Sequence, residues 1–112
     1  IIRENKIEIT FQMINPLGYL EMLWLIQNCS LIITDSGGLQ KEAYFFEKLC
    51  LTTRTETEWV ELLESGNNIL VTYETNKILT EFNARKKFKS IGKLHGEGNT
   101  SELIIKALLE TT

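Results

Sequence analysis

The sequence predicts an α/β fold in which a Rossmann-like parallel sheet carries helices on both faces. Short runs rich in β-branched residues alternate with stretches whose apolar residues recur at helical spacing, and short polar links join the two kinds of segment. This alternation is typical of parallel strands joined by crossover helices, which cover both faces of the sheet. With 112 residues, the chain is long enough for one domain at most.

Nine segments of regular structure follow from these patterns. We expect strands at residues 8–14, 31–34, 49–53 and 69–72, and helices at residues 19–28, 38–47, 58–65, 75–87 and 100–109. Thr55 and Glu58 have the spacing of a capping box, which predicts where the helix over 58–65 begins. Residues 1–5 look like the end of a helix and no initiator Met precedes them, so we expect a piece of a longer protein.

The composition is that of an ordinary soluble globular protein. Apolar residues make up 43% of the chain and charged residues 24%. No apolar run approaches the ~20 residues that a membrane-spanning helix needs, and the net charge of −3 gives no general affinity for nucleic acid. We interpret the basic run at 85–89 as the solvated end of a helix. Neither a membrane nor a nucleic acid is therefore an expected partner.

The cysteines and the histidine form no metal-binding pattern. Cys29, Cys50 and His95 are too widely spaced to supply a ligand set, so we expect no metal, and the sequence indicates no cofactor. We expect both cysteines to behave as small buried apolar residues in a reducing cytoplasm. His95 lies in a glycine-rich loop with no nucleophile or carboxylate placed beside it by spacing, and we assign it no catalytic role.

The most informative stretch runs from Leu31 to Ala43. An apolar run ends at Asp35-Ser36, two glycines follow, and a helix-forming sequence comes next, which predicts a strand, a tight turn and a helix. The start of such a helix offers unpaired N–H groups and a positive dipole end. Gly37 and Gly38 let a large group approach the backbone, and Ser36 can cap the helix or donate its hydroxyl. We expect a phosphate or diphosphate here; the alternative is a turn with no ligand.

Two charged residues are expected near this turn. In parallel sheets ligands bind beyond the carboxyl ends of the strands, where residues 15–18 and 54–58 also belong. Arg54 can neutralise a phosphate with two hydrogen bonds, or it can pair with a nearby glutamate and fix the loop. Glu42 lies about 8 Å along the helix, the reach from a diphosphate to its ribose. Its carboxylate can accept the ribose hydroxyls, or it can be a solvated helical side chain.

Several stretches carry a family resemblance in order and at matching spacing. They are Pro16-Leu17-Gly18-Tyr19-Leu20, Thr34-Asp35-Ser36-Gly37-Gly38-Leu39-Gln40-Lys41-Glu42-Ala43, Arg54 with Thr57-Glu58, and Gly96-Glu97-Gly98-Asn99-Thr100-Ser101-Glu102. Together they resemble the non-hydrolysing UDP-N-acetylglucosamine 2-epimerases over nearly the whole chain. The resemblance implies two Rossmann-like halves in the glycosyltransferase-B arrangement, with the active site between them. Residues 1–112 would be a single, partial UDP-binding domain of the C-terminal half.

The resemblance also implies a reaction and a ligand site. These enzymes invert C2 of UDP-N-acetylglucosamine to give UDP-N-acetylmannosamine: a base removes the C2 proton as UDP leaves, and UDP adds back to the 2-acetamidoglucal intermediate. By resemblance, Ser36 and Gly37 bind the diphosphate, Glu42 binds the ribose hydroxyls, and the backbone near Met22 binds the uracil. The complete UDP site that we expect consists of Met22, Ser36, Gly37, Gly38, Glu42, Arg54 and Glu58.

Two departures from the family pattern qualify the prediction. The family's acid/base carboxylates belong to the N-terminal half and its catalytic histidine lies upstream of Ile1, so we expect no catalytic residue and no activity from this chain alone. Many members also carry Arg-Pro after the Thr-Glu pair, whereas Trp59-Val60 stand here. This difference indicates loss of a basic contact near the phosphates and leaves open a more elaborated 2-acetamido sugar.

The expected partners follow from the same resemblance. We expect the helix at about 100–110 to pack on a missing N-terminal half, and the parent enzyme to be a cytoplasmic homodimer that serves polysaccharide biosynthesis. The alternatives are a hydrolysing 2-epimerase, the nucleotide-binding half of a glycosyltransferase of the same fold, and a truncated, non-catalytic nucleotide-binding or interaction domain. By itself, the isolated chain should be marginally stable or dimeric, because the apolar face of the last helix would be exposed.

Overall fold

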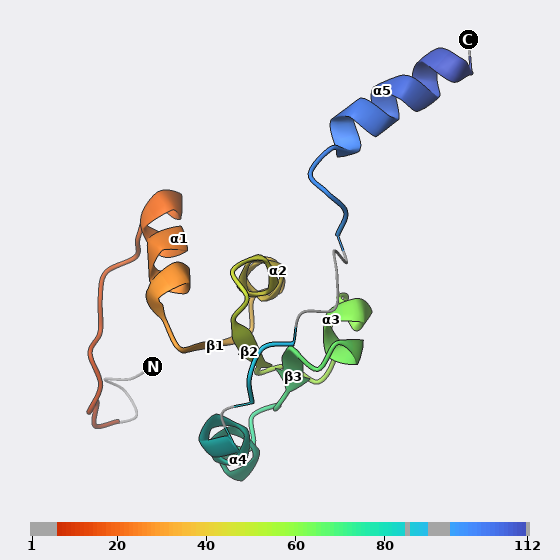
Figure 1. The fold of residues 1–112 in the computed structure, drawn as a ribbon. Helices are drawn as coiled ribbons and strands as arrows, with labels where there is room; N and C mark the ends of the chain where they lie inside the picture. Colours follow the sequence, from red (N-terminus) through yellow and green to blue (C-terminus); the bar gives the residue numbers. More distant parts are fainter. Residues whose placement is uncertain (1–6, 85, 90–94, 112) are drawn as a thin grey trace.

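A three-stranded parallel sheet organises the chain in the computed structural model, which describes residues 7–84, 86–89 and 95–111 (Figure 1). The strands are β1 (Leu31–Thr34), β2 (Leu49–Thr52) and β3 (Asn68–Leu70), and the helices are α1 (Tyr19–Asn28), α2 (Gly37–Phe45), α3 (Val60–Glu64), α4 (Thr75–Ala84) and α5 (Thr100–Glu110). The strand order is β1-β2-β3, with Leu31 paired to Leu49 and Cys50 paired to Asn68. The predicted α/β class is confirmed.

Helices cover both faces of this sheet, as predicted. Figure 1 shows α1 and α2 on one side and α4 on the other. The first face is held by a buried cluster of Ile26, Ile32, Ala43 and Cys50. The second face is held by Leu49, Leu51 and Val71, packed against Ile78 and Phe82 of α4. Because successive strand residues point to opposite faces, neighbouring residues of β2 contribute to different clusters.

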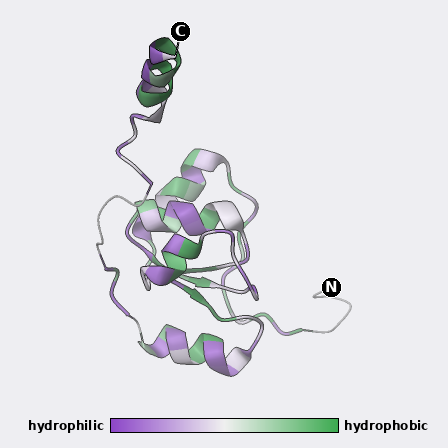
Figure 2. Cartoon of the chain, turned by 90° about the vertical axis from the view of Figure 1, so that its right-hand side faces the viewer, coloured by the Kyte–Doolittle hydropathy of each residue, from purple (hydrophilic) through white to green (hydrophobic). Residues whose placement is uncertain are grey.

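Helix α5 projects away from the sheet (Figure 1). The apolar side chains along it remain 54–71% exposed, and they are Leu103, Ile104, Ile105, Leu108 and Leu109. Figure 2 shows hydrophobic and hydrophilic residues side by side on this helix. The Cα radius of gyration is 17.6 Å, against about 13 Å for a compact chain of this length. The helix therefore forms where predicted but buries none of its apolar side chains.

The strand expected at 8–14 does not form. Residues 7–18 contain no strand, and most of their side chains are exposed, including Phe11 at 69% and Met13 at 59%. A β-strand requires a hydrogen-bonded neighbour, and the described sheet begins at β1. The alternation in this segment was therefore insufficient to predict a strand without a partner strand. The helix end expected at 1–5 lies outside the described residues.

The helix expected at 75–87 ends earlier, at Ala84, so the interpretation of the basic run as a helix end is wrong for residues 86–89. A side chain from elsewhere fixes this segment. Asn67 donates through Nδ2 to the Lys89 carbonyl and accepts from the Lys89 N–H, both at 2.7 Å. These bonds hold Lys89 beside the start of β3. Arg85 lies outside the described residues.

The predicted capping box is also wrong. Helix α3 begins at Val60, Trp59 occupies the N-cap position, and no side chain caps it. Thr57, rather than Thr55, acts locally, because its hydroxyl accepts a hydrogen bond from the Trp59 N–H at 3.2 Å. The Glu58 carboxylate is paired with Arg54 instead. The remaining predicted helices and strands are confirmed, with boundaries shifted by two residues at most.

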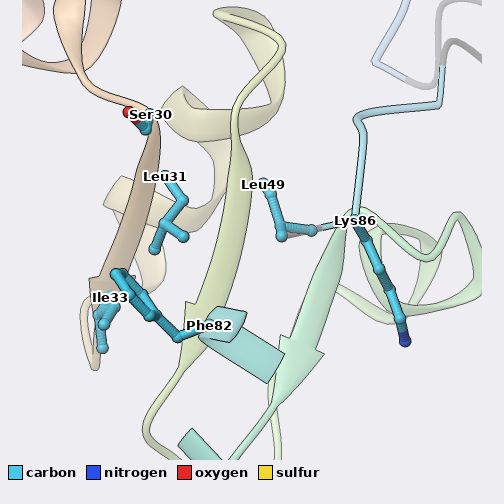
Figure 3. A pocket seen from close by; sticks show the side chains of 6 residues that line it. All are labelled: Ser30, Leu31, Ile33, Leu49, Phe82 and Lys86. Carbon is cyan, nitrogen blue, oxygen red and sulfur yellow. The ribbon is translucent and has the colours of Figure 1, made fainter. Parts of the chain in front are cut away.

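A cavity of about 380 Å³ lies on the α4 side of the sheet. Figure 3 shows its six lining residues, which are Ser30, Leu31, Ile33, Leu49, Phe82 and Lys86. Leu31 and Leu49 form the first pair of the β1–β2 ladder, so the cavity reaches the amino ends of these strands. The predicted ligand site lies at the opposite, carboxyl ends. The mostly apolar lining offers little hydrogen-bonding chemistry for a ligand.

Candidate functional site

The start of α2 is a capped helix terminus that directly follows β1. Ser36 is the N-cap residue, with extended backbone angles (φ −77°, ψ 127°), and its hydroxyl accepts a hydrogen bond from the Leu39 N–H at 3.4 Å. The Thr34 hydroxyl accepts from the Ser36 N–H at 3.1 Å, which fixes the turn between strand and helix. The first turn carries no acidic residue. The positive end of the helix dipole is therefore not neutralised within that turn.

The two glycines of this turn differ in their surroundings. A Cβ on Gly38 would meet nothing within 4 Å, so the space beside its backbone is open. A Cβ on Gly37 would collide with the Glu58 carboxylate and would lie 3.8 Å from the Trp59 indole nitrogen. In an α-helix the N–H groups of these first residues have no intrahelical acceptor. Among the described residues, none accepts a hydrogen bond from them.

Arg54 and Glu58 lie next to this helix terminus, as the sequence predicted for the rim. Arg54 Nη1 donates to Glu58 Oε2 at 3.1 Å, and both side chains are partly exposed. The pKa of Glu58 is lowered, chiefly because its carboxylate accepts a hydrogen bond from its own backbone N–H and further because of the Arg54 guanidinium. Arg54 thus provides a guanidinium near Gly37, although in this structure it is engaged by a carboxylate.

Glu42 lies one turn further along α2 and contacts the start of α1. The Tyr19 hydroxyl hydrogen-bonds to the Glu42 carboxylate, and this bond together with the Glu42 charge raises the pKa of Tyr19. Met22, three residues after Tyr19, is half-buried against the cluster that contains Ile26. The structure therefore brings the beginning of α1 to the same side of α2 as Glu42. Because no strand precedes residues 15–18, α1 rather than a strand end supplies this part of the rim.

A buried polar network, which the sequence did not predict, lies behind the α2 terminus. Its buried side chains are Gln40, Thr52 and Asn68, each exposed by 3% or less. Thr57 and Trp59 join this network from the loop before α3. A glutamine inside an otherwise apolar helix face was the one local signal, but its partners lie 17 and 28 residues away. No periodicity reveals such contacts.

His95 lies within a group of aromatic rings. Its ring centroid is 5.6 Å from those of Tyr44 and Phe45 and 6.1 Å from that of Trp59. Its Nδ1 lies 3.7 Å from a Glu61 carboxylate oxygen. These contacts hold the chain before α5 against the body of the domain.

The cysteines are free thiols. Cys50 is buried and Cys29 is half-buried against the same apolar cluster. Burial raises the pKa of Cys50 to about 11, so its thiol stays protonated at neutral pH. In the described ranges, no group of three or more metal-ligating side chains occurs. None of the helices there has the length and apolar character that crossing a membrane requires.

Comparison with known proteins supplies the family. A sequence profile described as UDP-N-acetylglucosamine 2-epimerase matches residues 1–109. The chain belongs to this family. A UDP-2,3-diacetamido-2,3-dideoxy-D-glucuronate 2-epimerase from Pseudomonas aeruginosa is 43% identical over 110 residues, an alignment that covers 96% of this chain and 31% of that protein. The resemblance inferred from the sequence motifs is confirmed.

Solved structures of the family share the fold. The crystal structure of Methanocaldococcus jannaschii UDP-GlcNAc 2-epimerase in complex with UDP-GlcNAc and UDP matches with a TM-score of 0.83 at 36% identity, covering 97% of this chain and 30% of that one. The Neisseria meningitidis enzyme bound to UDP-GlcNAc matches with a TM-score of 0.72 at 34% identity, covering 87% of this chain and 28% of that one. The chain thus spans about a third of the length of these epimerases.

Proposed function

We propose that this chain is the UDP-binding, C-terminal part of a nucleotide-sugar 2-epimerase. The observation that carries the proposal is the α2 terminus. There a serine caps the helix, and two glycines follow it at the carboxyl end of a parallel sheet, with open space beside Gly38. The family includes a solved complex with UDP-GlcNAc and UDP. Backbone N–H groups at a helix start are well suited to a diphosphate.

Each predicted site residue has a position that suits its proposed role. Ser36, Gly37 and Gly38 form the diphosphate cradle, and Glu42, one turn along the same helix, accepts the ribose hydroxyls. Arg54 stands beside Gly37 and supplies a positive charge for the phosphates, while Glu58 holds that guanidinium in place until the ligand arrives. The start of α1 lies against Glu42, which supports a uracil position along the backbone near Met22.

This arrangement favours a reaction in which UDP leaves. Cleavage of the bond between the sugar C1 and UDP places negative charge on the diphosphate. Fixed N–H donors and a guanidinium stabilise that charge without reorganising. The same cradle retains UDP while the C2 centre changes configuration, so UDP can add back to the unsaturated sugar. The proton transfers at C2 require residues from the rest of the protein, and the chain alone should be inactive.

The sugar has two candidates. The first is UDP-N-acetylglucosamine, converted to UDP-N-acetylmannosamine. The second is a UDP-sugar with an additional acetamido group and a carboxylate, because a 43% identical relative is described as acting on such a substrate and because Trp59 stands where many members carry arginine. Epimerisation assays with both substrates distinguish them, and release of UDP and free sugar with no UDP-linked epimer would indicate a hydrolysing enzyme instead.

The exposed apolar surfaces support a missing N-terminal half as partner. Helix α5 leaves its apolar residues open, and β1 has no neighbour on its outer side among the described strands. Near that edge, Ile33 is 47% exposed and Trp24 of α1 is 64% exposed. We assign the β1 edge and α5 to contacts with other parts of a two-halved epimerase. A cytoplasmic homodimer remains our expectation for the complete protein.

The decisive experiment is calorimetric titration of the full-length gene product with UDP. We expect micromolar binding by the wild type and at least tenfold weaker binding by Ser36→Ala and by Glu42→Gln, which is about 1.4 kcal/mol each. Gly38→Ala is the sharpest variant. Its methyl group meets nothing in this structure, so stability should hold or rise by about 0.4–1 kcal/mol, yet the methyl would occupy the diphosphate space and weaken UDP binding.

A matched variant separates ligand contacts from general effects. Ser101→Ala changes an exposed serine in the first turn of α5, which belongs to another helix start. It should bind UDP like the wild type. Unchanged UDP affinity in both Glu42→Gln and Gly38→Ala would contradict the proposed cradle. A folded wild-type protein that binds no UDP would favour a non-catalytic interaction domain.

A further inference from the structure

A buried chain of hydrogen bonds connects the sheet to the start of α2. The Thr52 hydroxyl of β2 donates to Asn68 Oδ1 of β3. Asn68 Nδ2 donates to Gln40 Oε1 at 2.8 Å, and the Thr57 hydroxyl donates to the same oxygen at 2.6 Å. Gln40 Nε2 then donates to the Ser36 carbonyl at 3.2 Å. Every member of this chain finds a partner of the opposite kind, so the orientation of the Gln40 amide is defined.

A second branch reaches the next residue of α2. The Thr57 hydroxyl accepts from the Trp59 backbone N–H at 3.2 Å, and the Trp59 indole N–H donates to the Gly37 carbonyl at 2.8 Å. Lys41 Nζ lies 4.7 Å from the centre of the Trp59 ring, which helps to fix the indole. Thr57 therefore links the Gln40 side chain to the Trp59 backbone. The side chains of these two residues bind the first two carbonyls of the helix terminus.

Those two carbonyls belong to the peptide planes that carry the two donor N–H groups. The Ser36 carbonyl shares its peptide plane with the Gly37 N–H, and the Gly37 carbonyl shares its plane with the Gly38 N–H. Because a peptide unit is planar and trans, fixing the carbonyl fixes the direction of the N–H on its opposite side. A hydrogen bond to the carbonyl also polarises the peptide and strengthens the N–H as a donor.

The need for such support follows from the glycines. Adjacent glycines have wide backbone freedom, and their peptide plane can rotate more easily than one between residues with side chains. The openness that lets a diphosphate approach Gly38 therefore carries a conformational cost. The helical bond from the Gln40 N–H to the Ser36 carbonyl, at 3.3 Å, restrains the first of these peptides. The Gln40 and Trp59 side chains restrict both peptides further through their carbonyls.

We propose that Gln40 and Trp59, coupled through Thr57, are positioning residues that aim the Gly37 and Gly38 N–H groups at the diphosphate. The inference rests on the proposed function, because it assigns a purpose to contacts behind the UDP cradle. The side chains of this network carry no group that titrates near neutral pH. Its contribution to UDP affinity should therefore be constant between pH 6 and 8, roughly the range in which histidine titrates.

The test is UDP titration of the full-length gene product in three variants, with thermal unfolding recorded in parallel. Trp59→Phe keeps an aromatic ring but removes the indole N–H, and Thr57→Val keeps the shape but removes the coupling hydroxyl. We expect each to weaken UDP binding about tenfold, the effect of one well-placed hydrogen bond group. Thr57→Ser restores the hydroxyl and should recover most of the affinity.

The control is a buried hydroxyl outside the network. Ser65 donates to the Leu62 carbonyl at 2.6 Å and accepts from the Asn67 N–H at 3.1 Å, so Ser65→Ala removes comparable bonds at the end of α3. It should lower the unfolding temperature and keep UDP affinity within about twofold of the wild type. Unchanged UDP affinity in Trp59→Phe and Thr57→Val, or equal weakening in Ser65→Ala, overturns the inference while the proposed function stands. Absence of wild-type binding rejects both.

Discussion

The start of α2 and the terminal helix α5 are both well-formed helical segments, yet they depend on their surroundings in opposite ways. At the start of α2, the Gln40 and Trp59 side chains bind the backbone, and Asn68 of β3 supports Gln40 from behind. Gln40 and Asn68 are exposed by only 1% and 3%. Along α5, the apolar side chains are more than half exposed and Figure 1 shows no neighbouring element. The first region is completed by contacts within this chain, whereas the second leaves its apolar side chains uncovered.

The two regions are stabilised in different ways. The network around Gln40 satisfies every buried polar group it contains, which rigidifies the helix terminus and the N–H groups there. Helix α5 forms its own helical hydrogen bonds, but its apolar side chains are more than half exposed. Because most helical stability in proteins comes from packing of such a face, we expect α5 to gain stability from a partner. We therefore expect substitutions in the first region to affect ligand binding and substitutions in the second to affect assembly.

The largest expected effect on stability comes from a Leu→Ala substitution, which we compare at a buried and at an exposed position. Leu51 is fully buried between the sheet and α4, whereas Leu108 of α5 is 62% exposed. Leu51→Ala should lower the free energy of unfolding of the 112-residue chain by about 3 kcal/mol, through lost burial and a residual cavity. Leu108→Ala should change it by less than about 0.5 kcal/mol. Urea unfolding followed by circular dichroism measures both.

The Leu51→Ala and Leu108→Ala variants should differ clearly in stability. Comparable destabilisation would mean that α5 is packed within the isolated chain, for example against a second copy. Sedimentation at two protein concentrations checks this directly, since packing between copies makes the stability depend on concentration.

The second prediction tests whether α5 packs against another part of the full-length protein. Leu108→Asp should leave the stability of a monomeric 112-residue chain nearly unchanged. In the full-length gene product it should cost about 2–3 kcal/mol, because an unpaired charge would enter an apolar interface. Thermal unfolding of both proteins gives the two values. Thr111→Asp, at the solvent-exposed end of the same helix, is the control for added charge. Equal effects in the two proteins would contradict an interface on α5.

A smaller effect tests strain next to the sheet. Thr72 follows β3 with φ 53°, a left-handed conformation that β-branched residues strongly disfavour, and its buried hydroxyl has no partner among the described residues. Thr72→Gly should raise the free energy of unfolding by about 1 kcal/mol, after the greater freedom of glycine in the unfolded chain is allowed for. Glu47→Gly relieves the strain of a similar φ of 55° at an exposed position, where no buried hydroxyl is involved. The free energy of unfolding should therefore rise by less than in Thr72→Gly. Destabilisation by Thr72→Gly would show that the side chain contributes more than its strain costs.

Local sequence patterns predicted the three strands and the five helices of the described chain because their apolar spacing is a local property. They failed at residues 8–14, where alternation exists but no partner strand does. They also failed at the end of α4, because Asn67, which fixes Lys89, lies 22 residues away. Contacts of that sequence separation leave no trace in periodicity.

The candidate site, like the fold, was predictable only in part from the sequence. Topology correctly brought Arg54 and Glu58 to the α2 terminus, because carboxyl ends of parallel strands share one edge. The supporting residues were not predictable, since Gln40, Thr57 and Asn68 come from three separate elements and only the folded chain brings their amide and hydroxyl groups together. Ligand contacts by the candidate site residues themselves stay predictions.

The smallest effect is spectroscopic and reports on Glu42 itself. Its carboxylate raises the pKa of Tyr19 by accepting the phenolic hydrogen bond and by its charge. A raised pKa in the folded state means that the contact is fully formed below the ordinary tyrosine value of about 10 and is lost as the pH rises through the raised value. Phenolate absorbance should show this late titration step in the wild type. Glu42→Gln should move the step back toward the ordinary value.

UDP makes this titration a direct test of ribose binding. If the ribose hydroxyls occupy Glu42, they replace the Tyr19 hydroxyl as donors, and saturating UDP should lower the pKa of Tyr19 toward its ordinary value. Tyr73→Phe removes an exposed tyrosine away from α1 and should leave the late step in place, which assigns the signal. A late step that persists unchanged under saturating UDP would mean that UDP binds without displacing Tyr19 from Glu42. The ribose role of Glu42 would then be wrong, whereas this result would leave the proposed diphosphate cradle untouched.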